Sequence, residues 1–188
     1  MMKRRLPEVL TDDEVKRLLS VPNKRYRTGL RNYLLMKVAV QTGMRVSELI
    51  NLKRDDIDFM TGKTFIRQAK GQKDRITFIK QETRDEIIRL WEMMSISSSY
   101  CFSTLEGSLL DTGYLRKTIK KYGTKSGITK RVYFHLLRHS ALTKLYQETH
   151  DIRKIQEIAG HRDISTTMIY THISGEDIKD TLLNKGFI

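Results

Sequence analysis

The chain has 188 residues, of which 39% are hydrophobic and 30% are charged. This balance is typical of a globular protein with one packed core, and it excludes a disordered chain. Lys and Arg outnumber Asp and Glu by 35 to 22, which gives a formal net charge of +13. Such a surplus favours a polyanionic partner, nucleic acid before an anionic membrane surface.

The sequence also limits the compartment in which the protein is expected to act. The single cysteine, Cys101, excludes an intramolecular disulfide, and no apolar run follows the basic residues of "MMKRRLPEVL" as it does in a signal peptide. The most apolar stretch, "YLLMKVAV", is short and is interrupted by Lys37, so we expect no transmembrane helix and no membrane partner. These features predict a cytoplasmic protein.

The sequence of the first 55 residues predicts three helices. The segment "LTDDEVKRLL" begins with Thr11, and Glu14 follows at the spacing of a capping box, so we expect Thr11 to be the N-cap. The segment "RNYLLMKVAVQTG" predicts a second helix that ends at Gly43, and "RVSELINL" predicts a short third one.

The pattern changes between residues 56 and 80, where apolar and polar residues alternate. Turn signals occur at residues 60–63, which include Gly62, and at residues 71–74. We therefore expect a three-stranded antiparallel sheet made of two hairpins.

Helical spacing returns after the predicted sheet. It occurs in "QETRDEIIRLWEMM" and in the basic amphipathic stretch "TGYLRKTIKKYG". From Phe134 to the end we expect four more short helices, separated near His150, Arg162 and Ser174. The fold class predicted from these elements is α+β, mostly α-helical with one small antiparallel sheet.

The segment "HLLRHS" places His135, Arg138 and His139 on one face of an otherwise apolar helix. Burying this cluster without partners would be costly, so it is either a ligand site or a satisfied structural network. A zinc site is an alternative, because the two histidines are four residues apart. However, the segment lacks the glutamate of H-E-x-x-H, and Arg138 would set a cation against the metal. We therefore predict no metal.

Three other motifs have both a functional and an ordinary interpretation. In "TGMRVSEL", Arg45 could bind a phosphate at the start of a helix, or it could be a surface arginine paired with Glu48. In "AKGQKDR", Lys70 could reach a substrate from a turn, or it could be a solvated lysine at a strand edge. In "TTMIYTH", Tyr170 could be a functional hydroxyl, or it could be a half-buried core tyrosine. His161 in "AGH" belongs with "HLLRHS" and lies 23 residues beyond Arg138.

The order of these motifs is more specific than any one of them. The series Arg, Lys, His-x-x-Arg, Gly-His, Tyr resembles the tyrosine recombinases, the family of phage integrases and Xer proteins. The resemblance extends over nearly the whole chain and is carried by "LTDDEVKRLL", "TGMRVSEL", "AKGQKDR", "HLLRHSALTKL" and "DIRKIQEIAGHRDISTTMIYTHI". It implies the catalytic-domain fold of the DNA breaking-rejoining enzymes over residues 1–188.

The resemblance also implies a site-specific recombinase that cleaves and rejoins double-stranded DNA through a covalent 3′-phosphotyrosine. In that chemistry, guanidinium groups suit a phosphodiester because each can donate two hydrogen bonds to it. The six expected catalytic residues are Arg45, Lys70, His135, Arg138, His161 and Tyr170, with Tyr170 as the nucleophile. Neither metal, ATP nor another cofactor is expected, because the covalent intermediate keeps the energy of the broken bond.

Other residues are expected to support the reaction or to contact DNA. Glu48 could orient Arg45, and His139 could support its neighbours. In the basic stretch, Arg116, Lys117, Lys120 and Lys121 are expected to contact the major groove or the DNA backbone.

The resemblance has one departure and leaves some alternatives open. Family members usually carry an N-terminal domain that clamps the other face of the DNA, and this chain begins where the catalytic domain usually begins. The C-terminal "GEDIKDTLLNKGFI" could dock onto a neighbouring subunit, giving a tetramer on nucleoid DNA, or it could pack on its own core. Two other functions stay open, namely a type IB topoisomerase and a non-catalytic DNA-binding module.

Overall fold

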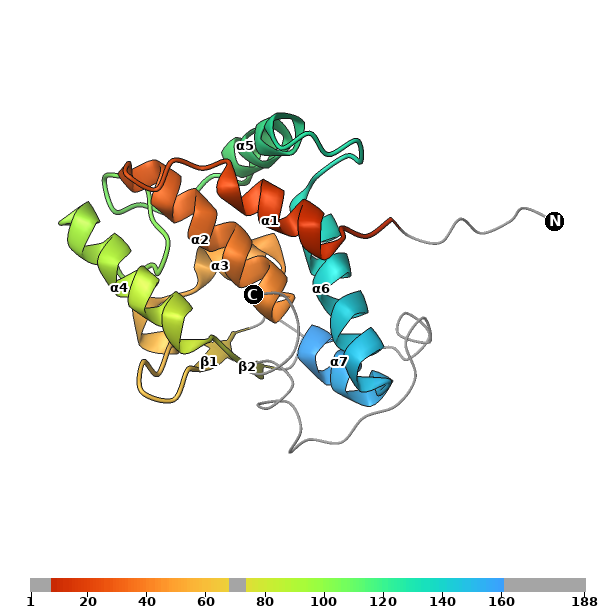
Figure 1. Cartoon of the computed structure of the whole chain (residues 1–188). Coiled ribbons are helices and arrows are strands. Elements are labelled where there is room, and N and C mark those ends of the chain that lie inside the picture. The colour runs from red at the N-terminus through yellow and green to blue at the C-terminus, as the bar shows by residue number, and fades with distance from the viewer. Residues whose placement is uncertain (1–7, 68–73, 161–188) are drawn as a thin grey trace.

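The computed structural model describes residues 8–67 and 74–160, and Figure 1 shows their arrangement. The elements are α1 (Asp12–Ser20), α2 (Arg27–Thr42), α3 (Val46–Asn51), a 3-10 helix (Arg54–Asp56), β1 (Lys63–Ile66), β2 (Arg75–Phe78), α4 (Gln81–Met94), α5 (Thr112–Lys125), α6 (Phe134–Thr149) and α7 (Ile152–Ala159). The fold is therefore α+β and mostly helical, as predicted.

Helix α2 lies at the centre of the described structure (Figure 1). Every residue from Gly29 to Thr42 is buried, because α1, α3, α4 and α6 pack around the helix. A helix that is covered on all sides has little freedom to shift or turn. The C-terminal end of α2 is therefore a fixed point in the molecule.

The predicted helix ends are confirmed. The side chain of Thr11 accepts a hydrogen bond from the backbone N–H of Glu14, and the Glu14 carboxylate accepts one from the N–H of Thr11. Gly43 ends α2 with φ 66°, in the left-handed region that favours glycine. His150 separates α6 from α7, also with a positive φ, so the predicted break near this residue is confirmed as well.

The predicted three-stranded sheet is wrong in one respect. Among the described residues, β1 and β2 pair antiparallel, and the expected first strand is reduced to a single bridge between Ile57 and Thr64. The cause is local. The Asp58 carboxylate accepts hydrogen bonds from the backbone N–H groups of Met60 and Thr61, at 2.9 and 3.2 Å. The chain therefore turns directly after Ile57, before a strand can extend.

A second hydrophobic cluster fixes α7 in place. It consists of Leu142 and Leu145 of α6, Phe78 of β2, Tyr146, and Ile152, Ile155, Ile158 and Ala159 of α7. The cluster holds the C-terminal end of α7 against both α6 and β2. The expected helix breaks near Arg162 and Ser174 lie outside the described residues.

No helix within residues 8–67 or 74–160 is both long enough and apolar enough to cross a membrane. In the same residues, no group of three or more His, Cys, Asp and Glu side chains is placed to hold a metal ion.

Candidate active site

Arg45 lies at the junction of α2 and α3. It follows the left-handed Gly43 by two residues and is the N-cap of α3, with extended backbone angles. Glu48, one turn into α3, accepts a hydrogen bond from the Arg45 backbone N–H at 2.7 Å and one from its Nη1 at 2.8 Å. The side chain of Arg45 stays about one third exposed, at 31%. The predicted pairing of Arg45 with Glu48 is thus present, and it leaves the arginine facing solvent in part.

Glu48 has a second arginine partner that the sequence analysis missed. The guanidinium of Arg75 donates from Nη1 and Nη2 to the two oxygens of Glu48, both at 2.8 Å. Both side chains are only 6% exposed. One feature of the sequence could have indicated that Arg75 is buried. In a strand, residues two apart lie on the same face, and Arg75 shares the buried face of β2 with Thr77.

The carboxylate of Glu48 is therefore held in its charged form. Burial by itself raises the pKa of Glu48, but the hydrogen bonds and charge of Arg75 outweigh it. The backbone N–H of Arg45 and the charge of Arg138 act in the same direction, and together they lower the pKa to about 2.

Arg138, in the second turn of α6, is buried to 2% exposure. Its Nη1 donates to the backbone carbonyl of Gly43, and its Nη2 donates to that of Ala159, both at 2.7 Å. These carbonyls lie at the C-terminal ends of α2 and α7, where helices have unsatisfied acceptors and a partial negative charge. Arg138 therefore links the C-terminal ends of α2 and α7 to α6. One of its two acceptors, Gly43, precedes Arg45 by two residues.

The two histidines of "HLLRHS" lie side by side. The rings of His135 and His139 meet edge to face, with 4.9 Å between their centroids. His135 is partly exposed and His139 is half-buried. Partial burial, then the charges of Arg138 and Arg45, lower the pKa of His135 below its ordinary value, and burial, His135 and Arg138 lower the pKa of His139. The lowered pKa favours the uncharged imidazole of His135, the form that can accept a proton.

The structure thus brings together three of the six expected catalytic residues. Arg45, His135 and Arg138 share one electrostatic environment, with Glu48 and His139 beside them. Lys70, His161 and Tyr170 lie outside the described residues.

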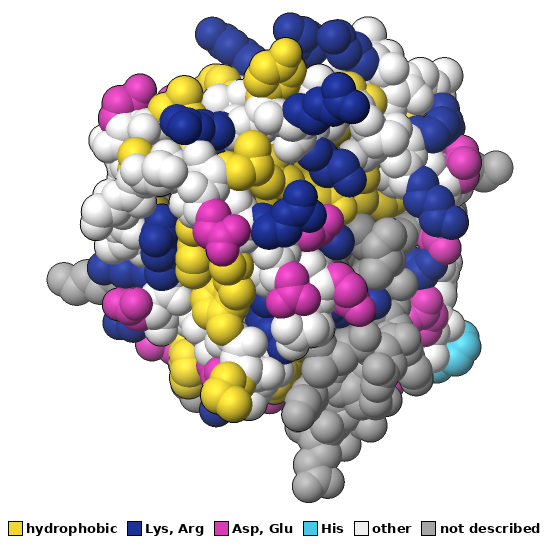
Figure 2. Space-filling view, turned by 60° about the vertical axis from the view of Figure 1, so that its left-hand side comes forward, with side chains coloured by type: hydrophobic (Ala, Val, Ile, Leu, Met, Phe, Trp, Pro, Cys, Tyr) yellow, Lys and Arg dark blue, Asp and Glu magenta, His cyan; other side chains and the backbone are white. Residues whose placement is uncertain are grey.

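Helix α5 carries the other predicted contact residues. Arg116, Lys117, Lys120 and Lys121 are all exposed. The face drawn in Figure 2 carries many Lys and Arg side chains, most of them across its upper part, at the end of the molecule where α5 lies in Figure 1. This distribution is what an electrostatic contact with a polyanion requires.

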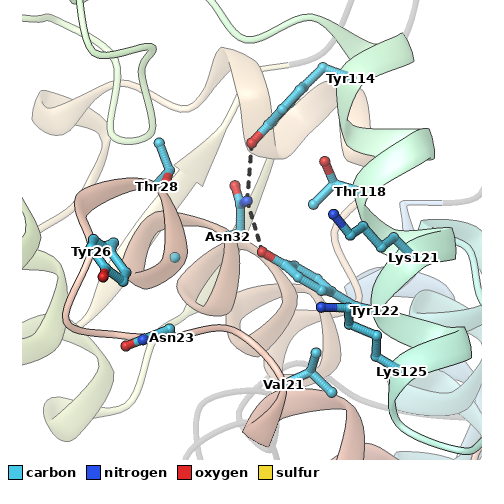
Figure 3. A pocket seen from close by; sticks show the side chains of 11 residues that line it. Val21, Asn23, Tyr26, Thr28, Asn32, Tyr114, Thr118, Lys121, Tyr122 and Lys125 are labelled. Carbon is cyan, nitrogen blue, oxygen red and sulfur yellow. Dashed lines mark hydrogen bonds between the residues drawn. The ribbon is translucent and has the colours of Figure 1, made fainter.

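A pocket of about 410 Å³ separates one face of α5 from the segment between α1 and α2 (Figure 3). The lining residues are Val21, Asn23, Tyr26, Thr28, Gly29, Asn32, Tyr114, Thr118, Lys121, Tyr122 and Lys125, and none of these is acidic. On one wall, the Asn32 amide donates to the hydroxyl oxygens of Tyr114 and Tyr122, at 3.2 and 3.3 Å. The buried Arg31 donates to the Tyr114 hydroxyl oxygen as well. Lys121 and Lys125 therefore face a polar, positively charged hollow.

Comparison with known proteins shows the family to which the chain is similar. The model of the phage integrase family matches residues 8–176. The chain is 41% identical over 179 residues to tyrosine recombinase XerA of Thermococcus kodakarensis, and 38% identical over 184 residues to tyrosine recombinase XerD of Staphylococcus epidermidis. Each alignment covers 94% of this chain but 62% of the relative, so the chain spans less than two thirds of the length of these proteins.

A solved structure shows the same fold. The pre-cleavage complex of the XerH site-specific recombinase with its difH substrate superposes with a TM-score of 0.76 and 31% identity, covering 90% of this chain and 51% of XerH. The match of the family model over most of the chain, together with these relatives, identifies the chain as a member of the phage integrase family, the tyrosine recombinases.

Proposed function

We propose that this chain acts as a site-specific DNA recombinase or integrase that cleaves and rejoins DNA strands through a covalent 3′-phosphotyrosine. The observation that carries the proposal is the fixed position of Arg45 and Arg138 around the C-terminal end of α2, with His135 in the same electrostatic environment. Two guanidinium groups set in this way suit the charge that builds on the nonbridging oxygens of a reacting phosphodiester.

The proposed cleavage step uses both described residues and residues known only from the sequence. The phenol oxygen of Tyr170 attacks the scissile phosphorus, and its proton passes to His135. The bond from phosphorus to the 5′ oxygen breaks, and Lys70 gives a proton to that oxygen. Arg45 and Arg138 bind the nonbridging oxygens throughout, with a further hydrogen bond from His161. The products are a 3′-phosphotyrosine and a free 5′ hydroxyl.

Rejoining is the reverse reaction with a different strand. The 5′ hydroxyl of a partner strand gives its proton to Lys70 and attacks the phosphotyrosine, and Tyr170 leaves with a proton returned by His135. The phosphodiester energy stays in the covalent intermediate, so the cycle needs neither ATP hydrolysis nor a metal ion.

Helix α5 is proposed to contact double-stranded DNA. Its outward side chains Arg116, Lys117 and Lys120 provide positive charge on one face, and Lys121 and Lys125 provide it beside the pocket. The XerH relative is described as bound to its difH substrate, which supports DNA as the partner. Contacts of this kind position the protein on the duplex and make binding sensitive to salt.

The proposal is tested with nicked suicide DNA, from which the freed fragment diffuses away after cleavage. The substrate is a pool of sequences from the flanks of the chain's own gene, with EDTA present. We expect a covalent protein–DNA band on a denaturing gel for the wild type and none for Tyr170→Phe. Sequencing the trapped DNA should give one preferred site, whereas many unrelated sites would indicate a topoisomerase. DNA binding in a gel shift without any covalent band would contradict the proposal and favour a non-catalytic DNA-binding module.

A further inference from the structure

Arg75, at the start of β2, makes contacts with two other segments of the site. Its two Nη atoms donate to Glu48 at the start of α3, and its Nε donates to the backbone carbonyl of Ile158 at 2.9 Å. Ile158 lies in the last turn of α7. One buried side chain therefore links the sheet, α3 and α7. Such a planar fork with five donors cannot be replaced by the single ammonium of lysine.

The end of α7 is held by two arginines at successive residues. Arg75 binds the carbonyl of Ile158, and Arg138 binds the carbonyl of Ala159. Gly160 then ends the helix with φ 62°, and a Cβ atom added there would lie 2.9 Å from Cδ of Arg75. Glycine is favoured at this position both by the backbone angle and by the close approach of Arg75. The side chain of Arg75 thus fixes where α7 ends.

Arg75 also affects the charge that Arg45 presents. The Oε1 atom of Glu48 accepts from Nη1 of Arg45 and from Nη1 of Arg75, each at 2.8 Å. One carboxylate is therefore shared between two guanidinium groups. If Arg75 were absent, more of the negative charge of Glu48 would act on Arg45, and Arg45 would attract an anionic phosphate less strongly.

We propose that Arg75 is a positioning residue of DNA cleavage, which orients Arg45 through Glu48, leaves positive charge on Arg45 for the phosphate, and fixes the end of α7. This inference rests on the proposed function, since it needs a cleavage reaction to act on. An alternative is a purely structural ion pair, whose loss would lower folding stability without a specific effect on phosphate charge.

The chain contains a matched control for this alternative. Arg84 of α4 is also buried, to 4% exposure, and it lies just past the other end of β2. It donates to the backbone carbonyls of Phe59, Met60 and Ile79 and to the side-chain oxygen of Gln81, and none of these groups belongs to Glu48. The variant Arg84→Lys should therefore disturb packing around the same sheet without reaching Arg45.

The experiment measures single-turnover formation of the covalent complex at saturating protein for the wild type, Arg75→Lys and Arg84→Lys. DNA affinity by gel shift and thermal unfolding are measured in parallel. Arg75→Lys keeps a positive charge near Glu48, so the chain should fold. However, one ammonium cannot pair with both carboxylate oxygens as the guanidinium does, so more of the negative charge of Glu48 is left facing Arg45. We expect its cleavage rate to fall about tenfold or more, because a displaced catalytic group loses rate steeply. DNA affinity should stay within about twofold of the wild type, because Arg75 is not at the surface.

A second substrate separates positioning from general damage. In a methylphosphonate, a methyl group replaces one nonbridging oxygen of the scissile phosphate, so the reacting group is neutral and needs less positive charge. We expect Arg75→Lys to lower the cleavage rate clearly less on this substrate than on the phosphate. Arg84→Lys should lower the cleavage rate by the same factor on both substrates, or should leave it unchanged on both.

Equal losses for Arg75→Lys on both substrates, or an unchanged cleavage rate on phosphate, would overturn the inference. The wild type and Tyr170→Phe are run beside the variants, so that the two proposals can fail separately. If the wild type is active but Arg75→Lys gives either of these contrary results, only the positioning role is rejected. An inactive wild type rejects the proposed function and this inference with it.

Discussion

The arginines at the junction of α2, α6 and α7 differ from the lysines of α5 in burial and in partners. Arg75 and Arg138 are at least 90% buried and donate to a carboxylate and to backbone carbonyls at 2.7 to 2.9 Å. Lys117 and Lys120 are exposed on α5. Both regions are positive, but only the first has a fixed geometry.

This difference has a physical consequence for each region. A buried guanidinium held by several hydrogen bonds keeps its position, which is what stabilising a transition state requires. An exposed lysine is mobile and hydrated, so it contributes attraction that depends on salt and little on exact geometry. We therefore expect the arginine cluster to determine the cleavage rate and α5 to determine affinity for DNA.

The largest predicted effect is that of Arg138→Lys. Lysine cannot reach the carbonyls of Gly43 and Ala159 and also present a fork to a phosphate. We expect single-turnover cleavage to fall by about 10²- to 10³-fold, which is typical for the loss of one preorganised donor. DNA affinity in a gel shift should change little. A loss of affinity as large as the loss of rate would show that the cluster and α5 do not have separate roles.

A smaller effect is predicted for α5. The double variant Lys117→Gln, Lys120→Gln removes two exposed charges, and the slope of log affinity against log salt should become shallower by about 2 if both lysines neutralise phosphates. Cleavage at saturating protein should be unchanged. The matched variant Lys121→Gln, Lys125→Gln tests the face beside the pocket in the same way. An unchanged slope in both variants would show that the DNA does not lie along α5.

The smallest predicted effect is on the pKa of His135, which lies beside the buried arginines. Its pKa, followed by NMR through the ring proton, should lie below the ordinary value of about 6.5. Arg45→Gln should raise it, because one nearby positive charge is removed. A wild-type pKa at or above the ordinary value would show that the arginines do not influence this ring.

The sign of the linked stability follows from the direction of this pKa shift. Protonation favours the unfolded chain, so the contribution of His135 to folding stability is fully present above about pH 6.5 and is lost as the pH falls through its lower folded-state pKa. Cleavage that depends on His135 as a proton acceptor should decline over the same acidic range.

Sequence reasoning was most successful where the interactions are local. The capping box of Thr11 and Glu14 and the left-handed end at Gly43 involve residues only a few positions apart, and both are present. The bounds of α4 were predicted to the residue, since its apolar spacing and its end are set within one segment. The first predicted strand was wrong because Asp58 closes a turn that periodicity does not reveal.

By itself, the sequence determined the helices, their caps and the order of the motifs that identify the family. Only the tertiary structure decided what the buried arginines contact. Glu48 and Arg75 are 27 residues apart, and Arg138 reaches a carbonyl 95 residues away at Gly43 and another at Ala159. These pairs form because α6, α7 and β2 pack through a shared apolar cluster, and long-range packing of this kind leaves no regular spacing in the sequence.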